Sequence, residues 1–234
     1  MPELPFLEVL AENLAARVSG RRIESILIRQ PNLLQTASPS PETFIGEFLS
    51  LPTRVGKFLV LETESRRAIV IHLMRVGRID VGPAARSAGL PKHLSARIVF
   101  DDGAMLRLVE HGKEKRARLW LVEDTSDVED LGRLGADPSR GELSYERFSD
   151  ALKTASRRLK GFLTDQRTIA GIGNGLSDEI LYEARLSPMK LTGALTEAEA
   201  RELHAAVLAV VSAQTGKLRE SAREIGRASC RERV

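Results

Sequence analysis

The chain has 234 residues, of which 42% are hydrophobic, and this is enough for one large or two ordinary domains with apolar cores. No apolar run approaches the ~20 residues of a membrane-spanning helix, and the start lacks the basic and then apolar layout of a signal peptide, so we expect a cytoplasmic protein without a membrane partner. The single cysteine, Cys230, excludes an internal disulfide framework and a multi-cysteine metal site in this chain. We therefore expect the chain as given to hold no metal ion and no cofactor.

The formal net charge is only +3, but the sequence pI is about 9.2 and the basic residues are clustered. They form three groups along the chain: Arg54, Lys57, Arg66, Arg67, Arg75 and Arg78; Lys113, Lys115, Arg116 and Arg118; Arg157, Arg158 and Lys160. Such groups would bind a phosphate-rich partner if folding gathered them on one face. Ordinary solvated surface is the alternative, and charge alone favours it.

The first residues can place an unusual amine beside a carboxylate. If Met1 is removed, as a small following residue permits, the chain begins with Pro2, whose ring nitrogen is then a secondary amine. An α-amino group titrates near ~7.7–8.0, so a fraction is neutral and nucleophilic at physiological pH and can form an imine with a sugar aldehyde carbon. Glu3 is the adjacent acid that could handle the protons. Without further support, a proline-rich opening is more typical of a frayed end.

The first half of the chain predicts one helix followed by many short strands. Leu7, Leu10, Leu14 and Val18 are spaced by three and four, which indicates an amphipathic helix over 7–18. Short β-rich runs follow at 22–28, 54–61, 68–73, 77–81, 96–100, 105–109 and 116–122. Because no helices alternate with these runs, we expect an antiparallel sandwich or barrel rather than a parallel sheet.

Two local signals refine this prediction. The turn residues Asp101-Asp102-Gly103 between two of the runs indicate a hairpin. Ser40 followed by Pro41 is typical of a cap and a first-turn proline, and predicts a short helix that carries Phe44 and Phe48.

The composition changes in the second half. Acids, glycines and a proline between Asp124 and Gly141 indicate a linker, after which the apolar period becomes helical. Ser144 is expected to cap a helix that extends to Leu159, and Thr196 with Glu199 forms a capping box for a later one.

Between these helices lies the glycine turn Gly171-Ile172-Gly173-Asn174. It is not a Rossmann fingerprint, because no strand precedes it and the third glycine is out of step. Asn174 is a good N-cap for the apolar helix that follows. Its side-chain amide, together with the free N–H groups of that helix end and of Gly173, could bind a DNA phosphate. Lys160 could add a charge. The alternative is that Asn174 only caps its helix and the glycines only permit a tight crossing.

Together these segments resemble one known family. The opening Met1-Pro2-Glu3-Leu4-Pro5, the Gly56-Lys57 strand, the Ile71–Met74 strand and the segment from Asp165 to Pro188 resemble the formamidopyrimidine-DNA glycosylase and endonuclease VIII family in order and approximate spacing. The resemblance implies an α+β fold: an N-terminal β-sandwich with an N-terminal helix (1–123), a linker (124–141) and an α-helical helix-two-turn-helix domain (142–223).

The resemblance also implies a function, a base-excision-repair DNA glycosylase with abasic-site lyase activity that removes oxidised bases from damaged double-stranded DNA. Pro2 resembles the amino-terminal nucleophile, Glu3 its acid/base partner, and Lys57 the strand lysine that contacts the lesion and its phosphate. Asn174 resembles the phosphate-gripping asparagine, with Lys160 as helper. The damaged base would be flipped out of the duplex, which is easier for a lesion than for a sound pair.

The chain departs from the family pattern at several positions. Phe6 stands where a second glutamate is more usual, and the gap left by the flipped base would be filled by Met74 or Arg75. The second loop, from Glu110 to Arg118, lacks the usual Arg-Arg-Phe, and Arg116 is its expected DNA contact.

The family usually ends in a four-cysteine zinc finger, and a structural zinc site needs four side-chain ligands. Because this chain has one cysteine, the zinc finger is expected to be absent from it. The resemblance implies that a full-length form holds zinc. Residues 224–234 have no apolar period and look like a translated sequencing-library adapter, so we interpret them as a non-native tail. His72 and His111 are interpreted as packed or hydrogen-bonded side chains rather than metal ligands.

Two further functions stay open. One is a relative that binds DNA or abasic sites without turnover, and the other is an RNA- or ribosome-associated protein that uses the same helical turn on phosphates. We expect a monomer, because the protein must wrap a duplex.

Overall fold

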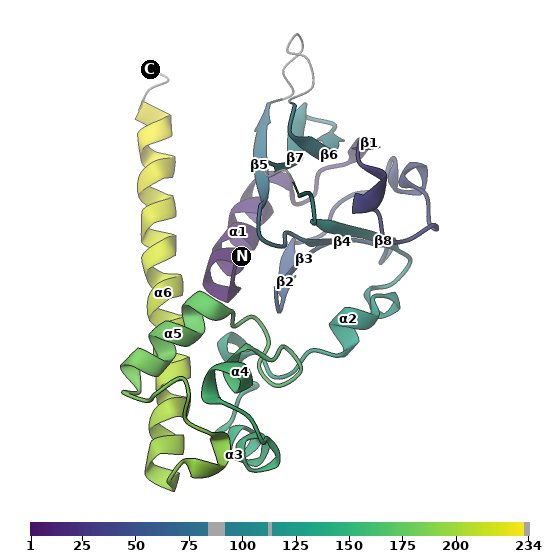
Figure 1. Ribbon diagram of the computed structural model, residues 1–234. Coiled ribbons are helices and arrows are strands. Elements are labelled where there is room, and N and C mark those ends of the chain that lie inside the picture. The colour runs from purple at the N-terminus through teal and green to yellow at the C-terminus, as the bar shows by residue number, and fades with distance from the viewer. Residues whose placement is uncertain (84–91, 112–113, 232–234) are drawn as a thin grey trace. The chain divides into compact units, whose positions relative to one another are not determined.

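The computed structural model describes residues 1–83, 92–111 and 114–231, with side chains as far as residue 222 (Figure 1). It divides into two compact units, Met1–Pro2 with Leu10–Gly132, and Glu3–Val9 with Arg133–Val234. The predicted α+β class is confirmed. In the described part of the chain, no helix combines the length and the apolar character that crossing a membrane requires.

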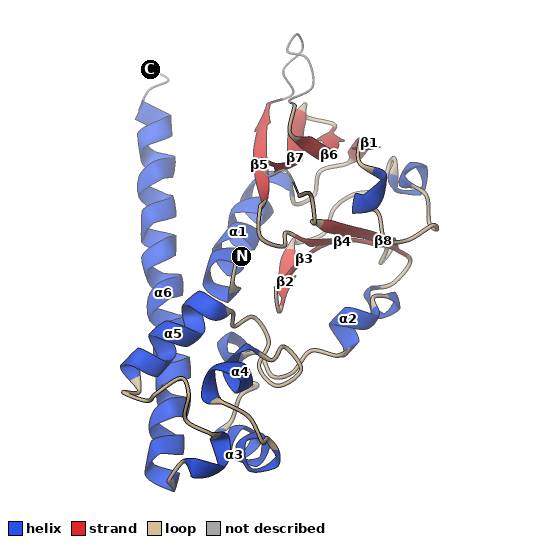
Figure 2. Ribbon diagram, in the orientation of Figure 1, coloured by secondary structure: helices blue, strands red, loops and turns tan. Residues whose placement is uncertain are grey.

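The first unit contains two four-stranded antiparallel sheets, the predicted β-sandwich (Figure 2). One sheet has the order β1-β6-β7-β5, formed by Ile23–Ile28, Leu94–Phe100, Ala104–Glu110 and Gly77–Pro83. The other has the order β2-β3-β4-β8, formed by Thr53–Val55, Phe58–Glu62, Ala68–His72 and Arg118–Val122. The predicted turn at 101–103 joins β6 to β7, with Gly103 at a φ of 77°.

The two sheets bury their strands differently. Along β6 and β7 burial alternates, with Ile98 and Leu106 in the core and Arg97 and Arg107 on the opposite face. The central strands β3 and β4 are buried on both faces, which accounts for their almost continuous apolar sequence.

The predicted strand 54–61 is wrong in one respect that matters for the site. It is two strands, β2 and β3, joined by the two-residue turn Gly56–Lys57, with Val55 paired to Phe58. Gly56 has a φ of 56°, a left-handed conformation that glycine adopts without steric cost and that is common in two-residue hairpin loops. Lys57 therefore lies at a turn rather than inside a strand.

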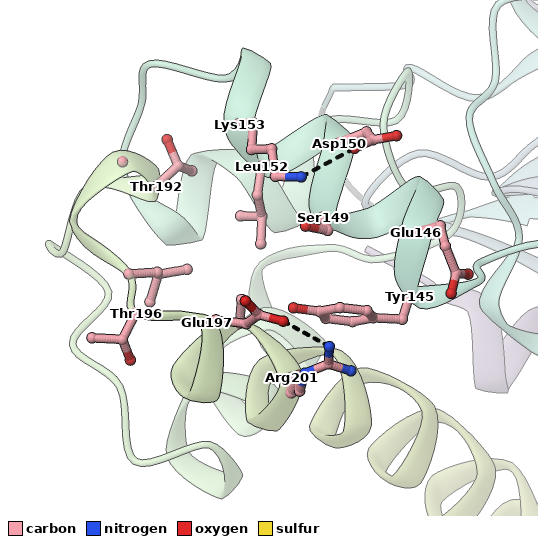
Figure 3. A pocket seen from close by; sticks show the side chains of 13 residues that line it. Tyr145, Glu146, Ser149, Asp150, Leu152, Lys153, Thr192, Thr196, Glu197 and Arg201 are labelled. Atoms are coloured by element: carbon pink, nitrogen blue, oxygen red, sulfur yellow. Dashed lines mark hydrogen bonds and ion pairs between the residues drawn. The ribbon is translucent and has the colours of Figure 1, made fainter.

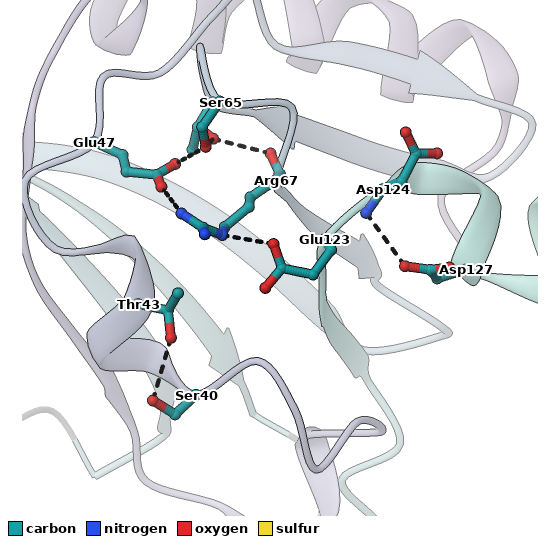
Figure 4. A network of polar contacts seen from close by, with 9 residues as sticks. Ser40, Thr43, Glu47, Ser65, Arg67, Glu123, Asp124 and Asp127 are labelled. Atoms are coloured by element: carbon teal, nitrogen blue, oxygen red, sulfur yellow. Dashed lines mark hydrogen bonds and ion pairs between the residues drawn. The ribbon is translucent and has the colours of Figure 1, made fainter.

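The short helix predicted after Ser40 is a single 3₁₀ turn, Pro41–Phe44. The Ser40 side chain does not cap it, and contacts the Thr43 hydroxyl instead (Figure 4). Phe44 is fully buried, but Phe48 lies beyond the helix with 42% of its surface exposed, so the prediction that Phe48 belongs to this helix is wrong. Other short elements of this unit are the 3₁₀ turns Pro31–Leu33 and Thr125–Asp127 and the helix α2, Glu129–Gly132.

A polar network ties three segments of the first unit together (Figure 4). Arg67 forms an ion pair with Glu47, and its Nε donates to Glu123 at 2.7 Å, while the Ser65 hydroxyl donates to Glu47 at 2.6 Å. Burial raises the pKa of the Glu47 carboxyl, but hydrogen bonds from Ser65, Thr63 and Arg67 outweigh it and leave the pKa below its usual value. Glu47 is thus held as a carboxylate.

The second unit is helical. Its elements are the 3₁₀ turns Pro138–Arg140 and Thr192–Ala194 and the helices α3 (Tyr145–Thr154), α4 (Leu159–Thr164), α5 (Asn174–Glu183) and α6 (Glu197–Arg231). Ser144 caps α3 as predicted, but that helix ends at Thr154, and Leu159 begins α4 instead of ending α3. The predicted capping box of α6 is confirmed by reciprocal bonds between Thr196 and Glu199.

The helix α1, Leu4–Val18, begins three residues before the predicted helix, and its first part belongs to the second unit. Leu4 is fully buried in the apolar cluster of that unit with Phe148, Phe162 and Ile180. The predicted division into 1–123 and 142–223 stays a prediction, and it placed the whole of this helix with the β-sandwich. The backbone of α6 continues as a helix through 224–231, and the interpretation of that segment as a non-native tail stays a prediction.

Candidate active site

The carboxylate of Glu3 lies at the start of α5, next to the glycine turn 171–174. The N-terminal segment and the glycine turn, which are far apart in the sequence, therefore meet at this helix end. Its Oε2 accepts the backbone N–H of Gly173 at 3.0 Å and of Leu176 at 2.9 Å, and its Oε1 accepts the N–H of Gly175 at 3.0 Å. The first N–H groups of a helix have no partner within the helix, and the helix dipole favours a negative charge at this end. Glu3, 170 positions before Gly173, therefore caps α5 through tertiary structure.

The glycines of the turn permit this close approach. A Cβ on Gly173 would lie 2.4 Å from Oε1 of Glu3, closer than any real contact. A Cβ on Gly171 would lie 2.7 Å from Cβ of Leu4, and Gly171 also has a φ of 90° and accepts the Leu4 N–H at 3.0 Å. The glycines are needed because the N-terminal segment packs directly against the turn.

The prediction for Asn174 needs correction. Gly173 is the N-cap of α5, Asn174 is its first helical residue, and no side chain of the helix itself caps it. Three N–H groups at this helix end, expected to be free for a phosphate, are used by Glu3. The exposed side-chain amide of Asn174 makes no hydrogen bond within the described residues, and it remains available for a ligand.

Gln166 holds the turn from the other side and was not singled out from the sequence. Its Nε2 donates to the carbonyl of Ile172 at 2.7 Å and of Thr164 at 2.8 Å, and its Oε1 accepts the Gly171 N–H at 3.0 Å. An amide that donates and accepts in this way fixes both sides of a loop at once. The signal in the sequence is a glutamine five residues before the first glycine.

The basic group before the turn is partly neutralised by neighbouring acids. The Lys160 ammonium donates to both carboxylate oxygens of Asp178 at 2.6 and 2.8 Å, and Arg157 pairs with Asp165 at 2.6 Å. The Lys160 side chain is 37% exposed, so this is a solvent-accessible pair of modest strength. Lys160 is thus positioned near the start of α5 but is already engaged by a carboxylate.

Lys57 is 6% exposed, and a buried arginine organises its turn. Arg54, 1% exposed, donates from Nη1 to the carbonyl of Gly56 at 3.0 Å. This carbonyl belongs to the residue directly before Lys57, so the contact with Arg54 helps to fix the backbone from which the Lys57 side chain extends. The sequence places Arg54 only in a basic group, and its burial cannot be seen there.

His72, on β4, lies beside this turn. Its Nδ1 accepts the backbone N–H of Met74 at 3.1 Å, and its ring packs edge-on against Phe58 with 4.8 Å between centroids. Burial, together with the charges of Lys57 and Arg118, lowers the pKa of His72 to about 4. The imidazole is therefore neutral at physiological pH, in agreement with its interpretation as a packed, hydrogen-bonded side chain.

The predicted wedge residues lie on a tight turn after β4. Met74 has a φ of 50°, unusual for a residue with a side chain, and the Gly77 N–H closes the turn on the Leu73 carbonyl at 3.0 Å. Arg75 is exposed and Met74 is half-buried. The charge of Lys57 acts on His72, which also accepts the Met74 N–H. The predicted site residues Lys57, Met74 and Arg75 therefore lie in the same part of the first unit.

Arg116 lies in a different loop of that unit. Its guanidinium pairs with Glu114 at 2.7 Å, and both side chains are well exposed. Its backbone N–H and that of Ala117 donate to the buried carboxylate of Glu110 at 2.8 and 2.9 Å. Lys113, from the same basic group, lies outside the described residues.

The second unit also has a pocket of about 600 Å³ between α3 and the start of α6 (Figure 3). Arg201 lies over the ring of Tyr145 at 4.2 Å and pairs with Glu197 at 2.7 Å, and Lys153 pairs with Asp150. The pocket contains none of the predicted site residues, and these charges are matched within it. We do not assign it to the site.

The contact between Glu3 and the glycine turn gives a testable prediction. Gly173→Ala should displace the Glu3 carboxylate and lower the free energy of unfolding by about 1–3 kcal/mol, as overpacking of a tight contact does. Gly175→Ala is the matched control, because its Cβ would lie at an ordinary 3.6 Å from Oε1 of Glu3. That variant should be neutral or slightly stabilising, since alanine favours a helix over glycine. Chemical denaturation measures both, and equal stabilities would contradict the proposed packing.

Comparisons with known proteins agree with this arrangement. Residues 1–114 match the model of the formamidopyrimidine-DNA glycosylase N-terminal domain, and residues 134–222 match that of the formamidopyrimidine-DNA glycosylase H2TH domain. The formamidopyrimidine-DNA glycosylase of Heliobacterium modesticaldum is 33% identical over 217 residues, which cover 90% of this chain and 77% of that protein. That of Symbiobacterium thermophilum is also 33% identical, over 90% of this chain and 69% of that protein.

Solved structures show the same fold. The MutM (Fpg) protein from Thermus thermophilus is 29% identical, with a TM-score of 0.80 over 92% of this chain and 76% of that one. The Lactococcus lactis Fpg, in a complex with DNA that contains an abasic site, has a TM-score of 0.83 at 23% identity, over 92% of this chain and 78% of that one. Two family models along most of its length and relatives one third identical over nine tenths of it establish that the chain belongs to the formamidopyrimidine-DNA glycosylase family.

Proposed function

We propose that the protein is a DNA glycosylase for oxidised bases with abasic-site lyase activity, and that Pro2, after removal of Met1, is its nucleophile. The observation that carries the proposal is the Glu3 carboxylate, held by three backbone N–H groups directly next to Pro2 in the chain. Membership of the formamidopyrimidine-DNA glycosylase family supports the reaction class, and a relative of the same fold is solved with abasic-site DNA.

In the proposed reaction, the Pro2 nitrogen attacks the anomeric carbon C1′ of the damaged nucleotide. The new N–C1′ bond forms as the glycosidic bond breaks, the base leaves with a proton from water, and the N–H proton of Pro2 passes to the Glu3 carboxylate. The bond between C1′ and O4′ then breaks as the nitrogen and C1′ form an iminium ion, and O4′ takes the proton from Glu3, which now acts as general acid. Loss of a proton from C2′ to water and cleavage of the C3′–O bond release the strand on the 3′ side with a 5′-phosphate. Water then hydrolyses the imine, which restores Pro2 and leaves an unsaturated sugar aldehyde on the other strand.

The hydrogen bonds of Glu3 suit this role. A carboxylate has about four acceptor positions, two on each oxygen. Oε2 uses both of its positions, for Gly173 and Leu176, whereas Oε1 uses one, for Gly175. Oε1 therefore keeps one position for a proton that moves to or from the sugar.

The remaining residues would bind the DNA. Lys57 would contact the lesion and its phosphate, and the side-chain amide of Asn174 would bind a further phosphate. Lys160 would reach the backbone only by leaving or sharing Asp178. Met74 or Arg75 would occupy the gap left by the flipped base, and Arg116 would contact the DNA from its own loop.

The zinc expected for a full-length form does not fit the described residues. Among them, no group of three or more His, Cys, Asp or Glu side chains could hold a metal ion.

Borohydride trapping tests the nucleophile. Incubation of the Met1-processed protein with abasic duplex and borohydride should give a covalent adduct that peptide mass spectrometry maps to Pro2. Pro2→Gly should slow trapping by at least about tenfold, because the secondary amine is lost. Phe6→Ala, at an exposed neighbour on α1, should trap at the wild-type rate. Normal binding of abasic DNA with no adduct would overturn the lyase assignment and favour a non-catalytic binder.

A double-mutant cycle tests the DNA contact of Lys57. Lys57→Ala should weaken binding of a duplex with a non-cleavable abasic analogue by about tenfold, and should reduce the slope of log K against log salt by about 0.9, the loss of one phosphate contact. Arg54→Met should have a similar effect because it releases the Gly56 carbonyl, and the double variant should be no worse than either single one.

The control for this cycle is Val70→Ala, a buried core change on β4 that should lower stability without altering the salt slope. If Lys57→Ala binds like the wild type, the proposed role of Lys57 is wrong. If the two single effects add, Arg54 does not act through Lys57.

A further inference from the structure

Two arginines lie side by side on the outward face of the sheet β1-β6-β7-β5. Arg97 on β6 is directly opposite Arg107 on β7, in a row that begins with Leu27 on β1 and ends with Asp80 on β5. Side chains directly opposite on antiparallel strands lie about 4.5–5.5 Å apart at Cβ, and like charges there are destabilising. The repulsion between the two positive charges therefore has to be offset by a nearby negative charge.

The compensation within the protein is incomplete. Asp80 forms an ion pair with Nη2 of Arg107. Arg97 makes no ion pair or hydrogen bond within the described parts of the chain. Arg78, two residues before Asp80 on the same face of β5, adds a further positive charge, since its Nη1 donates to the neutral carbonyl of Gly77 at 2.8 Å. Among the described residues of β5, β6 and β7 on this face, the charged side chains are thus the guanidinium groups of Arg78, Arg97 and Arg107 and the paired carboxylate of Asp80.

Both arginines of the pair also have a donor atom that the described part of the protein leaves unsatisfied. The Nε atoms of both Arg97 and Arg107 are covered from solvent and have no hydrogen-bond partner among the residues that the structure describes. A covered donor without a partner is rare in a folded protein, and it leaves part of the hydrogen-bonding capacity of each guanidinium unsatisfied. Because water does not reach the Nε atoms, an anion would meet the pair at its solvent-accessible parts. The Arg107 side chain keeps 23% of its surface exposed, so the outer end of the pair is accessible.

We propose that Arg97 and Arg107 form a binding site for an oxyanion of the phosphate class, independent of the active site. A phosphate oxygen suits the planar fork of a guanidinium, and two adjacent guanidinium groups can share one phosphate. The phosphate comes either from a nucleic-acid backbone or from a small phosphate, and the two sources are separable by experiment.

The first arm uses inorganic phosphate and pyrophosphate, at constant ionic strength with chloride as the reference anion. A ligand at ten times its Kd should raise the melting temperature of the wild type by about 3–6 °C. Arg97→Gln should lose this response, and Asp80→Asn should strengthen it because Arg107 is then released. Arg21→Gln is the matched control, since Arg21 is an arginine of the same unit paired with Asp102 at 3.2 Å, and it should respond like the wild type.

The stability of Arg97→Gln in chloride alone is a second readout. Removal of one of two opposed like charges should leave this variant at least as stable as the wild type, so a lost phosphate response cannot be attributed to misfolding. If the variant is instead strongly destabilised in chloride, Arg97 is structural and the proposal is wrong.

The second arm uses an undamaged duplex. If the source is a nucleic-acid backbone, Arg97→Gln weakens duplex binding and reduces the salt slope by about 0.9, whereas Arg21→Gln does not. If the source is a small phosphate, duplex binding is unchanged and only the first arm responds. Equal behaviour of Arg97→Gln and Arg21→Gln in both arms would overturn the proposal, whether or not the lyase assignment holds.

Discussion

The interaction on which the candidate site depends is the one between the Glu3 carboxylate and the start of α5. A helix end leaves its first N–H groups without partners, and here a carboxylate from the beginning of the chain accepts three of them at once. The contact requires Gly173 to lack a side chain, and it orders the start of the chain, which would otherwise be a frayed terminus. The same bonds satisfy the helix and hold the proposed acid in place.

A second constraint acts on Lys57. The turn that carries it depends on a left-handed glycine, Gly56, and on a buried arginine that holds the Gly56 carbonyl. A neutral His72 beside the lysine adds no competing positive charge to this region at physiological pH. Lys57 and Glu3 are thus positioned in different ways. Arg54 holds the turn that carries Lys57, whereas backbone N–H groups hold Glu3 directly, and both arrangements keep the geometry of a reactive group within narrow limits.

Much of the fold follows from local patterns in the sequence. The spacing of apolar residues predicted α1, the capping box at Thr196 predicted the start of α6, and the turn residues at 101–103 predicted the β6–β7 hairpin. These succeeded because each depends on residues a few positions apart. The break between β2 and β3 was missed, since an apolar run with one glycine is equally consistent with a single strand, and the φ of Gly56 depends on the pairing of β2 with β3.

The site shows the same division. The motif from Gly171 to Asn174 indicated the turn, but the three N–H groups expected to be free for a phosphate are bound by Glu3. A capping carboxylate supplied from 170 residues away leaves no local signal. The burial of Arg54, the engagement of Lys160 by Asp178 and the opposition of Arg97 and Arg107 are likewise products of tertiary pairing. Residue types and order named the candidate side chains, whose roles stay predictions, while the partners of those side chains required the structure.

The most direct measurement is the single-turnover behaviour of Glu3→Gln on an abasic duplex, with imine trapping and strand scission followed in parallel. A glutamine retains much of the shape of Glu3 but cannot deliver a carboxylic proton. The adduct should therefore still form, while scission should slow by about 100-fold or more. Scission at the wild-type rate in the folded variant would show that Glu3 is only a structural cap, and would contradict its role in the chemistry.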